Sequence, residues 1–173
     1  MWLNDNVRAA LEGAGYRVRA ISENDLVFED ESLLGFVSVK DTVSAILDVW
    51  ASEQDAFLKG NATQLRKEPR KAWNVYSVFL TEADCEAAQM SRVLDAEEDF
   101  RGTRKIVRCG LKTESDIQRA LYPLLPIENV VALSSEDAMA RVRGRLDLSE
   151  AIVAALAGNV ELDRVADELV RQS

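Results

Sequence analysis

The sequence predicts an α/β fold, also describable as α+β, with a mixed sheet of about five strands in α-β-β-β-α-β-α-β order, flanked by helices and followed by a C-terminal helical cap. Two observations lead to this prediction. Residues 16–40 hold three short apolar runs separated by polar turns, which is typical of an antiparallel meander. A long amphipathic helix and then the strongly apolar run at 73–80 follow. Such a helical crossover allows the next strand to lie parallel to the meander.

A short helix precedes the meander. Apolar residues recur at helical spacing over residues 3–11, and two glycines then end the segment. Within the meander, residues 16–20 alternate between apolar and arginine side chains, which indicates a half-exposed strand. The turns SENDL and DESLLG separate the strands, which we expect at residues 16–20, 26–29 and 35–40.

The long helix has clear start and stop signals. Asp41 or Thr42 can cap its first turn. Apolar residues from Val43 to Leu65 then keep a period near 3.6, which indicates one buried face. Pro69 cannot continue a helix, so we expect the segment to end within LRKEPRK.

The second half of the chain alternates strands and helices. The run WNVYSVFL is apolar on both faces, so it predicts a central strand whose aromatic residues, Trp73 and Tyr76, belong to the core rather than to a base-stacking surface. The remaining elements that we expect are a helix at 82–95, a strand at 104–109, a helix capped by Thr113 and Asp116 that ends before Pro123, and a strand at 129–133.

Length and composition bound the domain organisation and the class of protein. The chain of 173 residues fits one domain with a small appendage, and we expect a core domain at 1–133 and a C-terminal helical cap at 134–173. The net charge of -9 argues against bulk attraction to nucleic acid. The absence of histidine removes the commonest general base and zinc ligand.

The cysteines and the hydropathy indicate a compartment. Cys85 and Cys109 lack metal-type spacing, and we expect two inert core thiols in a reducing cytoplasm rather than a disulfide. No signal peptide and no apolar window long enough for a membrane span is present. These observations predict a cytoplasmic protein with no membrane partner and no cofactor.

The element order resembles the core of the restriction-endonuclease-like PD-(D/E)xK fold. In that family an acidic residue on the second strand and an E-x-K on the third bind Mg²⁺, and the lysine stabilises charge at the phosphate. Here Asp30 ends the second strand and Lys40 lies on the third, but Ser38 stands where the carboxylate is needed. The resemblance implies either a nuclease that acts through Asp30 and Lys40 or a degenerate, non-catalytic fold. In the structural alternative, residues 29–31 are simply a charged turn.

Two basic stretches are candidates for binding a partner or nucleic acid. The segment EEDFRGTRKIVRCG carries one, and LRKEPRK carries the other. Arginine can grip phosphate or carboxylate in a bidentate manner, although the neighbouring acids could instead neutralise these charges within a solvated loop. The candidate contact residues are Arg101, Arg104, Lys105, Arg108, Lys67 and Arg70.

The segments KAWNVYSVFLT, EEDFRGTRKIV and LYPLLPI, in this order, resemble the middle components of bacterial ABC-three-component defence systems. The resemblance covers roughly residues 26–127. It implies a non-catalytic adaptor that binds an SMC- or ABC-type ATPase or an effector subunit. The alternatives are the Mg²⁺-dependent nuclease and a small regulatory protein that acts through self-association.

Overall fold

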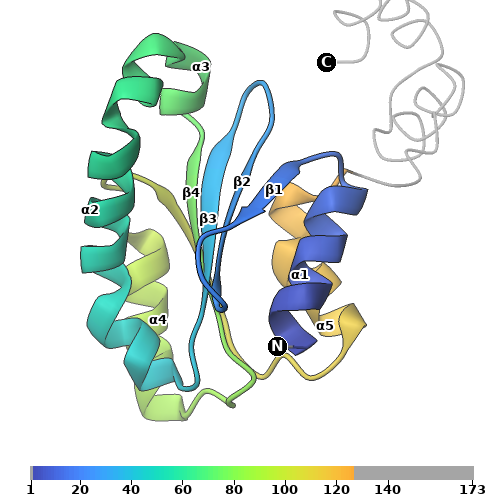
Figure 1. Ribbon diagram of the computed structural model, residues 1–173. Coiled ribbons are helices and arrows are strands. Elements are labelled where there is room, and N and C mark those ends of the chain that lie inside the picture. Colours follow the sequence, from blue (N-terminus) through green and yellow to red (C-terminus); the bar gives the residue numbers. More distant parts are fainter. Residues whose placement is uncertain (1, 127–173) are drawn as a thin grey trace, which may run out of the picture. The chain divides into compact units, whose positions relative to one another are not determined.

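A computed structural model describes residues 2–126, which form a five-stranded mixed sheet between two layers of helices (Figure 1). The strands lie side by side in sequence order, and the sheet is therefore built without any strand being skipped. The strands are β1 (Arg17–Ala20), β2 (Asp25–Glu29), β3 (Leu34–Val39), β4 (Val75–Leu80) and β5 (Arg104–Arg108).

The strand directions follow from the connections. Strands β1, β2 and β3 form an antiparallel meander joined by short turns. Strand β4 lies parallel to β3, and β5 lies parallel to β4, because a helix crosses over between the members of each pair. The predicted mixed α/β fold and its order α-β-β-β-α-β-α-β are thus confirmed. The further strand expected at 129–133 and the helical cap expected at 134–173 lie outside the described residues.

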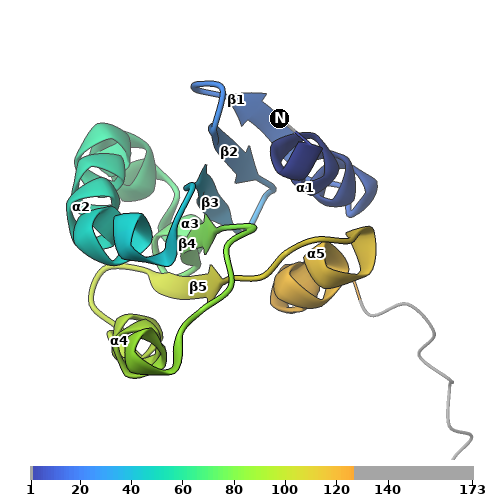
Figure 2. The same cartoon turned by 90° about the horizontal axis from the view of Figure 1, so that it is seen from below.

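Each face of the sheet has its own helices and its own core (Figure 2). One core contains buried residues of the first and fifth helices against Phe28 and Val37. The other contains buried residues of the second and fourth helices against Phe36 and Phe79. The helices are α1 (Trp2–Gly13), α2 (Val43–Lys67), the short α3 (Pro69–Ala72), α4 (Ala87–Glu98), α5 (Glu114–Leu121) and the 3-10 turn η1 (Tyr122–Leu124).

Local signals set the helix ends. The hydroxyl of Thr42 accepts a hydrogen bond from the Ala45 amide at 3.1 Å, which confirms this residue as the cap of α2. The predicted capping box of Thr113 and Asp116 is also present at α5. Helix α4 begins at residue 87 rather than 82, because the carboxylate of Glu86 caps it reciprocally with Gln89. Within residues 2–126, no helix is long and apolar enough to cross a bilayer.

A buried lysine ties α3 to the sheet. The Nζ atom of Lys71 lies 2.7 Å from Glu29 Oε2 on β2 and 2.7 Å from Glu68 Oε2, while only 4% of the Lys71 side chain is exposed. Gln64 Nε2 donates a further hydrogen bond to Glu29 at 3.0 Å. The hydrogen bond from Lys71 lowers the pKa of Glu29 below 4.5, although burial acts in the opposite direction. The end of α2, α3 and β2 therefore meet at one neutralised charge cluster.

This cluster predicts an acid-sensitive contribution to stability. Because the pKa of Glu29 is lower in the folded chain, the unfolded chain binds more protons once the pH drops below 4.5. The contribution is present above that pH and is lost as the pH falls through the folded pKa. Between neutral pH and about pH 3 to 4, the free energy of unfolding should fall less in a Lys71→Met variant than in the parent. Urea unfolding at each pH measures this difference. The same dependence of the unfolding free energy on pH in both proteins would contradict this prediction.

Candidate functional site

The structure does not bring together the two residues of the nuclease hypothesis. The Asp30 carboxylate accepts hydrogen bonds from the amides of Ser32 and Leu33, both at 2.7 Å, inside the turn between β2 and β3. Lys40 follows the other end of β3, where its Nζ lies 2.6 Å from Glu53 Oε1 of α2. Asp30 thus closes a turn, whereas Glu29 of the predicted charged turn belongs to β2, and Lys40 pairs with a residue of α2.

A different acidic residue faces Ser38. The antiparallel register sets Asp25, the first residue of β2, opposite Ser38 near the end of β3. The buried Ser38 hydroxyl donates to Asp25 Oδ1 at 2.8 Å, and the Ser22 hydroxyl donates to Oδ2 at 2.7 Å. Sequence reasoning missed Asp25. The signal that could have found it is the pairing rule of a meander, in which the start of one strand opposes the end of the next.

The carboxylates at this end of the sheet already have partners within the chain, which bears on whether they could hold a metal ion. A Mg²⁺ ion takes oxygen ligands and is usually held by one or two carboxylates together with substrate and water. Both oxygens of Asp25 accept serine hydroxyls, and Glu53 is paired with Lys40. Within residues 2–126, no three His, Cys, Asp or Glu side chains gather in a way that could hold a metal ion.

Lys105 belongs to the interior of the domain. Its side chain is fully buried, and its Nζ donates to the carbonyls of Asp99 and, at 2.7 Å, Arg101. The same atom lies 5.4 Å from the centre of the Trp50 ring. Burial lowers the pKa of Lys105, and the nearby Asp99 carboxylate opposes this effect. The ammonium group therefore fixes the loop before β5 and is out of reach of a partner.

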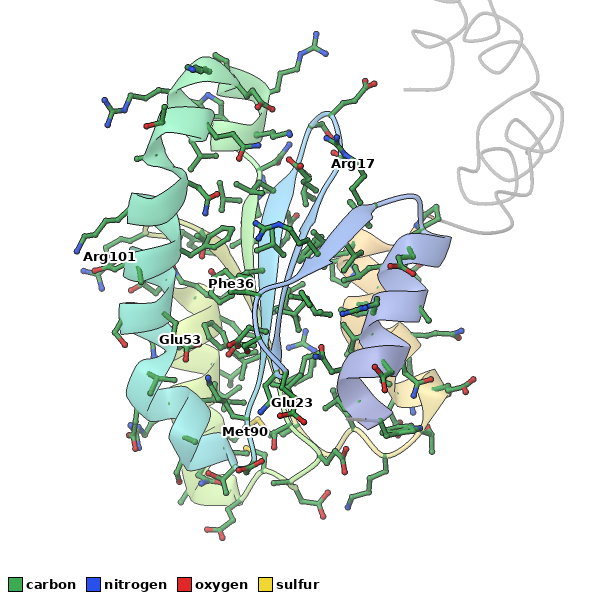
Figure 3. All side chains as sticks on the ribbon, viewed as in Figure 1. Arg17, Glu23, Phe36, Glu53, Met90 and Arg101 are labelled. Carbon is green, nitrogen blue, oxygen red and sulfur yellow. The ribbon has the colours of Figure 1, made fainter. Side chains whose placement is uncertain are left out.

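The other arginines around β5 differ in how much of their charge is free. Arg101 projects outward on the side of the sheet that α2 and α4 cover (Figure 3), and its NH2 lies 2.6 Å from Asp99 Oδ2. This pairing lowers the pKa of Asp99. Arg108 lies at the far end of β5 and pairs with Glu97. The Glu97 carboxylate also accepts a hydrogen bond from the Val107 amide at 2.9 Å, on the edge of β5 that faces away from β4.

Arg104 contacts an aromatic ring rather than a carboxylate of the described residues. Its guanidinium lies 5.8 Å from the centre of the Tyr76 ring, and NH1 donates to the Tyr76 hydroxyl at 3.2 Å. Lys67 at the end of α2 and Arg70 on α3 are exposed. Within residues 2–126, none of these three side chains forms an ion pair. They are the candidates that can still meet a carboxylate or phosphate.

Two exposed aromatic residues flank a hollow next to Arg104. Trp73 follows α3 and is 83% exposed, and Phe100 lies in the loop between α4 and β5 and is 82% exposed. The prediction that Trp73 lies in the core is wrong, because β4 starts only at Val75. The hollow has a volume of about 300 Å³ and is lined by Ala72, Trp73, Val75, Phe100, Gly102, Thr103 and Arg104. We call Trp73, Phe100 and Arg104 the aromatic–arginine surface.

The aromatic–arginine surface lies where the two basic stretches come together. The residues after α3, which continue LRKEPRK, and the loop before β5 line the same hollow, whereas Arg108 lies at the opposite end of β5. The loop is held from behind by buried hydroxyls. Thr103 Oγ1 donates to Gln54 Oε1 of α2 at 2.8 Å and contacts Ser77 Oγ at 2.8 Å. Phe100 and Arg104 are thus carried by a fixed backbone.

Comparisons of the chain with protein-family models, with curated proteins and with solved structures found no match. The resemblances to the defence-system components and to the restriction-endonuclease-like fold therefore stay predictions. The geometry of residues 2–126 offers a binding surface of two aromatic rings and a guanidinium. Such groups are suited to binding a partner, because aromatic rings bury a large apolar area and a guanidinium can donate several hydrogen bonds.

Proposed function

We propose that this protein is a non-catalytic accessory subunit, an adaptor in a bacterial anti-phage or anti-plasmid defence complex, and that it binds an SMC- or ABC-type ATPase or an effector subunit. The observation that carries the proposal is the exposure of Trp73 and Phe100 on two separate segments around one hollow. The motif resemblance supplies the class of partner. The proposal places the complex in the cytoplasm, whose reducing conditions favour the free form of the Cys85 and Cys109 thiols.

The energetics of the aromatic–arginine surface support a protein partner. Large aromatic side chains bury on the order of 150–250 Å² each when covered, and apolar burial is worth about 25 cal/mol per Å². Covering Trp73 and Phe100 would therefore stabilise a complex by several kcal/mol before the costs of association are counted. Trp and Arg are also the residues most enriched among those that dominate binding energy at protein interfaces. Arg104 adds a positive charge at the edge of the same hollow, and it forms no ion pair with any of residues 2–126.

The charge distribution favours a protein over a nucleic acid. Three of the six basic candidates, Arg101, Lys105 and Arg108, already pair with acidic residues of this chain. The whole chain carries a net charge of -9. A single strand of nucleic acid needs a basic groove that follows its backbone as well as aromatic rings, and Arg104 is the lining residue of this hollow that carries a positive charge.

The test is co-purification of the protein with an ATPase of this class encoded beside its gene. We expect Trp73→Ala and Phe100→Ala to weaken the complex by at least about tenfold each, measured by titration calorimetry. The matched control is Tyr122→Ala, which removes another exposed aromatic ring (66% exposed) away from the hollow and should leave the affinity unchanged.

Three outcomes would contradict the proposal. The first is equal affinity of all three variants for the ATPase. The second is tight binding of a fluorescein-labelled oligothymidylate that is lost in Trp73→Ala, which would assign the surface to nucleic acid. The third is a stable homodimer of the purified protein with no ATPase gene nearby, which would favour the self-associating regulator.

A further inference from the structure

The two cysteines lie in segments that meet at the carboxyl ends of neighbouring strands. Cys85 lies in the loop after β4, and Cys109 directly follows β5. Strands β4 and β5 are parallel, with Leu80 opposite Arg108, so the chain leaves both at the same edge of the sheet. Two backbone hydrogen bonds then hold the departing segments together, from Thr81 N to Arg108 O at 3.0 Å and from Gly110 N to Ala83 O at 2.8 Å.

The thiols share one environment. Both are free and half-buried, and both pack against the core between the sheet and helices α2 and α4. The pKa of the Cys109 thiol is raised to about 11, first by burial and then by a hydrogen bond with the Cys85 thiol. The hydrogen-bonded backbones and the shared core therefore bring the two cysteine segments together, which their separation in the sequence conceals.

We propose that Cys85 and Cys109 form an oxidation site that reacts with a hydroperoxide and closes an intramolecular disulfide. The site is separate from the aromatic–arginine surface, which lies where β4 and β5 begin. Its formation does not depend on the proposed adaptor function.

The chemistry takes two balanced steps. The Cys85 thiol attacks one oxygen of the hydroperoxide, the O–O bond breaks, and Cys85 sulfenic acid and an alcohol (or water, from hydrogen peroxide) are formed. The Cys109 sulfur then attacks the sulfenic sulfur, the S–O bond breaks, and the disulfide forms as water leaves with the thiol proton. Burial raises the pKa of the Cys109 thiol, so we assign the first step to Cys85, and Cys109 attacks as its thiolate in the second step. The product is the same disulfide whichever sulfur is oxidised first.

The backbone pairing of the two segments favours the bond. A disulfide needs Cα atoms about 4.4–6.8 Å apart, and the hydrogen bonds between residues 81–83 and 108–110 hold the two backbones at sheet-like separation. The closed loop would contain α4 and β5. Because a cross-link mainly restricts the unfolded chain, the disulfide should stabilise the fold.

The experiment uses the full chain treated with a small excess of hydrogen peroxide and examined by intact mass spectrometry after alkylation of free thiols. We expect a mass lower by two hydrogen atoms with no alkylation, complete reversal by dithiothreitol, and a melting temperature raised by roughly 4–8 °C in the oxidised form. Cys85→Ser and Cys109→Ser should each abolish this product, and Cys85→Ser should leave Cys109 available to alkylation after the peroxide treatment.

Two results would overturn the proposal. One is stepwise addition of oxygen to each cysteine without loss of hydrogen, which would show that the sulfurs cannot meet. The other is a disulfide-linked dimer as the product, which would show that the bond forms between chains. Circular dichroism of the two serine variants before treatment confirms that each is folded, so that a missing product reports on the thiols.

Discussion

Replacing Gly35 with alanine should lower the free energy of unfolding by about 3 kcal/mol. A Cβ atom at this position would lie 2.3 Å from Cζ and 2.6 Å from Cε1 of Phe28. Gly35 is the cross-strand partner of Phe28, whose fully buried ring packs edge-on against Tyr16 at a centroid distance of 5.4 Å. The ring cannot move aside without displacing the core on the α1 side, so strand β3 and the core must both distort.

A second glycine provides the matched control. Gly60 lies inside α2, and a Cβ atom there would have no neighbour within 4 Å. Gly60→Ala should therefore raise the free energy of unfolding by about 0.5–1 kcal/mol, because alanine is the better helix former. Urea unfolding followed by circular dichroism measures both variants. Effects of the same sign would show that the close approach of Gly35 to Phe28 is not what the sheet depends on.

Replacing Lys105 with alanine should lower the free energy of unfolding by about 3 kcal/mol. The variant leaves the carbonyls of Asp99 and Arg101 without their donor and removes the alkyl chain that packs beside Trp50. The loop before β5 would lose its inner anchor, and with it the fixed position of Phe100.

The control for Lys105 is Arg101→Ala, which removes a neighbouring basic residue whose side chain is exposed to solvent and pairs with Asp99. Its unfolding free energy should stay close to that of the parent, since exposed ion pairs add little stability. Urea unfolding monitored by tryptophan fluorescence compares the two. If Lys105→Ala behaved like Arg101→Ala, the buried position of the Lys105 ammonium group would be wrong.

The order of helices and strands could be predicted because its signals are local. The alternation at residues 16–20, the cap at Thr42 and the capping box at Thr113 each act within a few neighbouring residues. The sequence predicts the start of β4 two residues too early, at Trp73 instead of Val75. Trp73 and Asn74 stand directly before the apolar run of β4, but Trp73 is the C-cap of α3 and has a helical backbone conformation.

The candidate site could be predicted only in part, because its members come from distant segments. In the sequence, Lys105 is one of several basic residues in a row, and nothing local distinguishes it from Arg104. In the structure, Arg104 at the start of β5 is exposed and Lys105 is buried. The facing of Asp25 and Ser38 requires the strand register, and the proximity of Cys85 to Cys109 requires the parallel pairing of β4 with β5. No sequence window contains these pairs.

The carboxylate of Glu97 has a consequence for how the protein can assemble. Within residues 2–126, β5 is the last strand of the sheet, and an unpaired strand edge can pair with a strand of another chain. Glu97 occupies the amide of Val107 and holds Arg108 alongside. An incoming strand would have to displace both charges before it could pair with this edge. A partner that approaches β5 must therefore recognise side chains. Edge-to-edge pairing of sheets from different molecules is opposed along this strand.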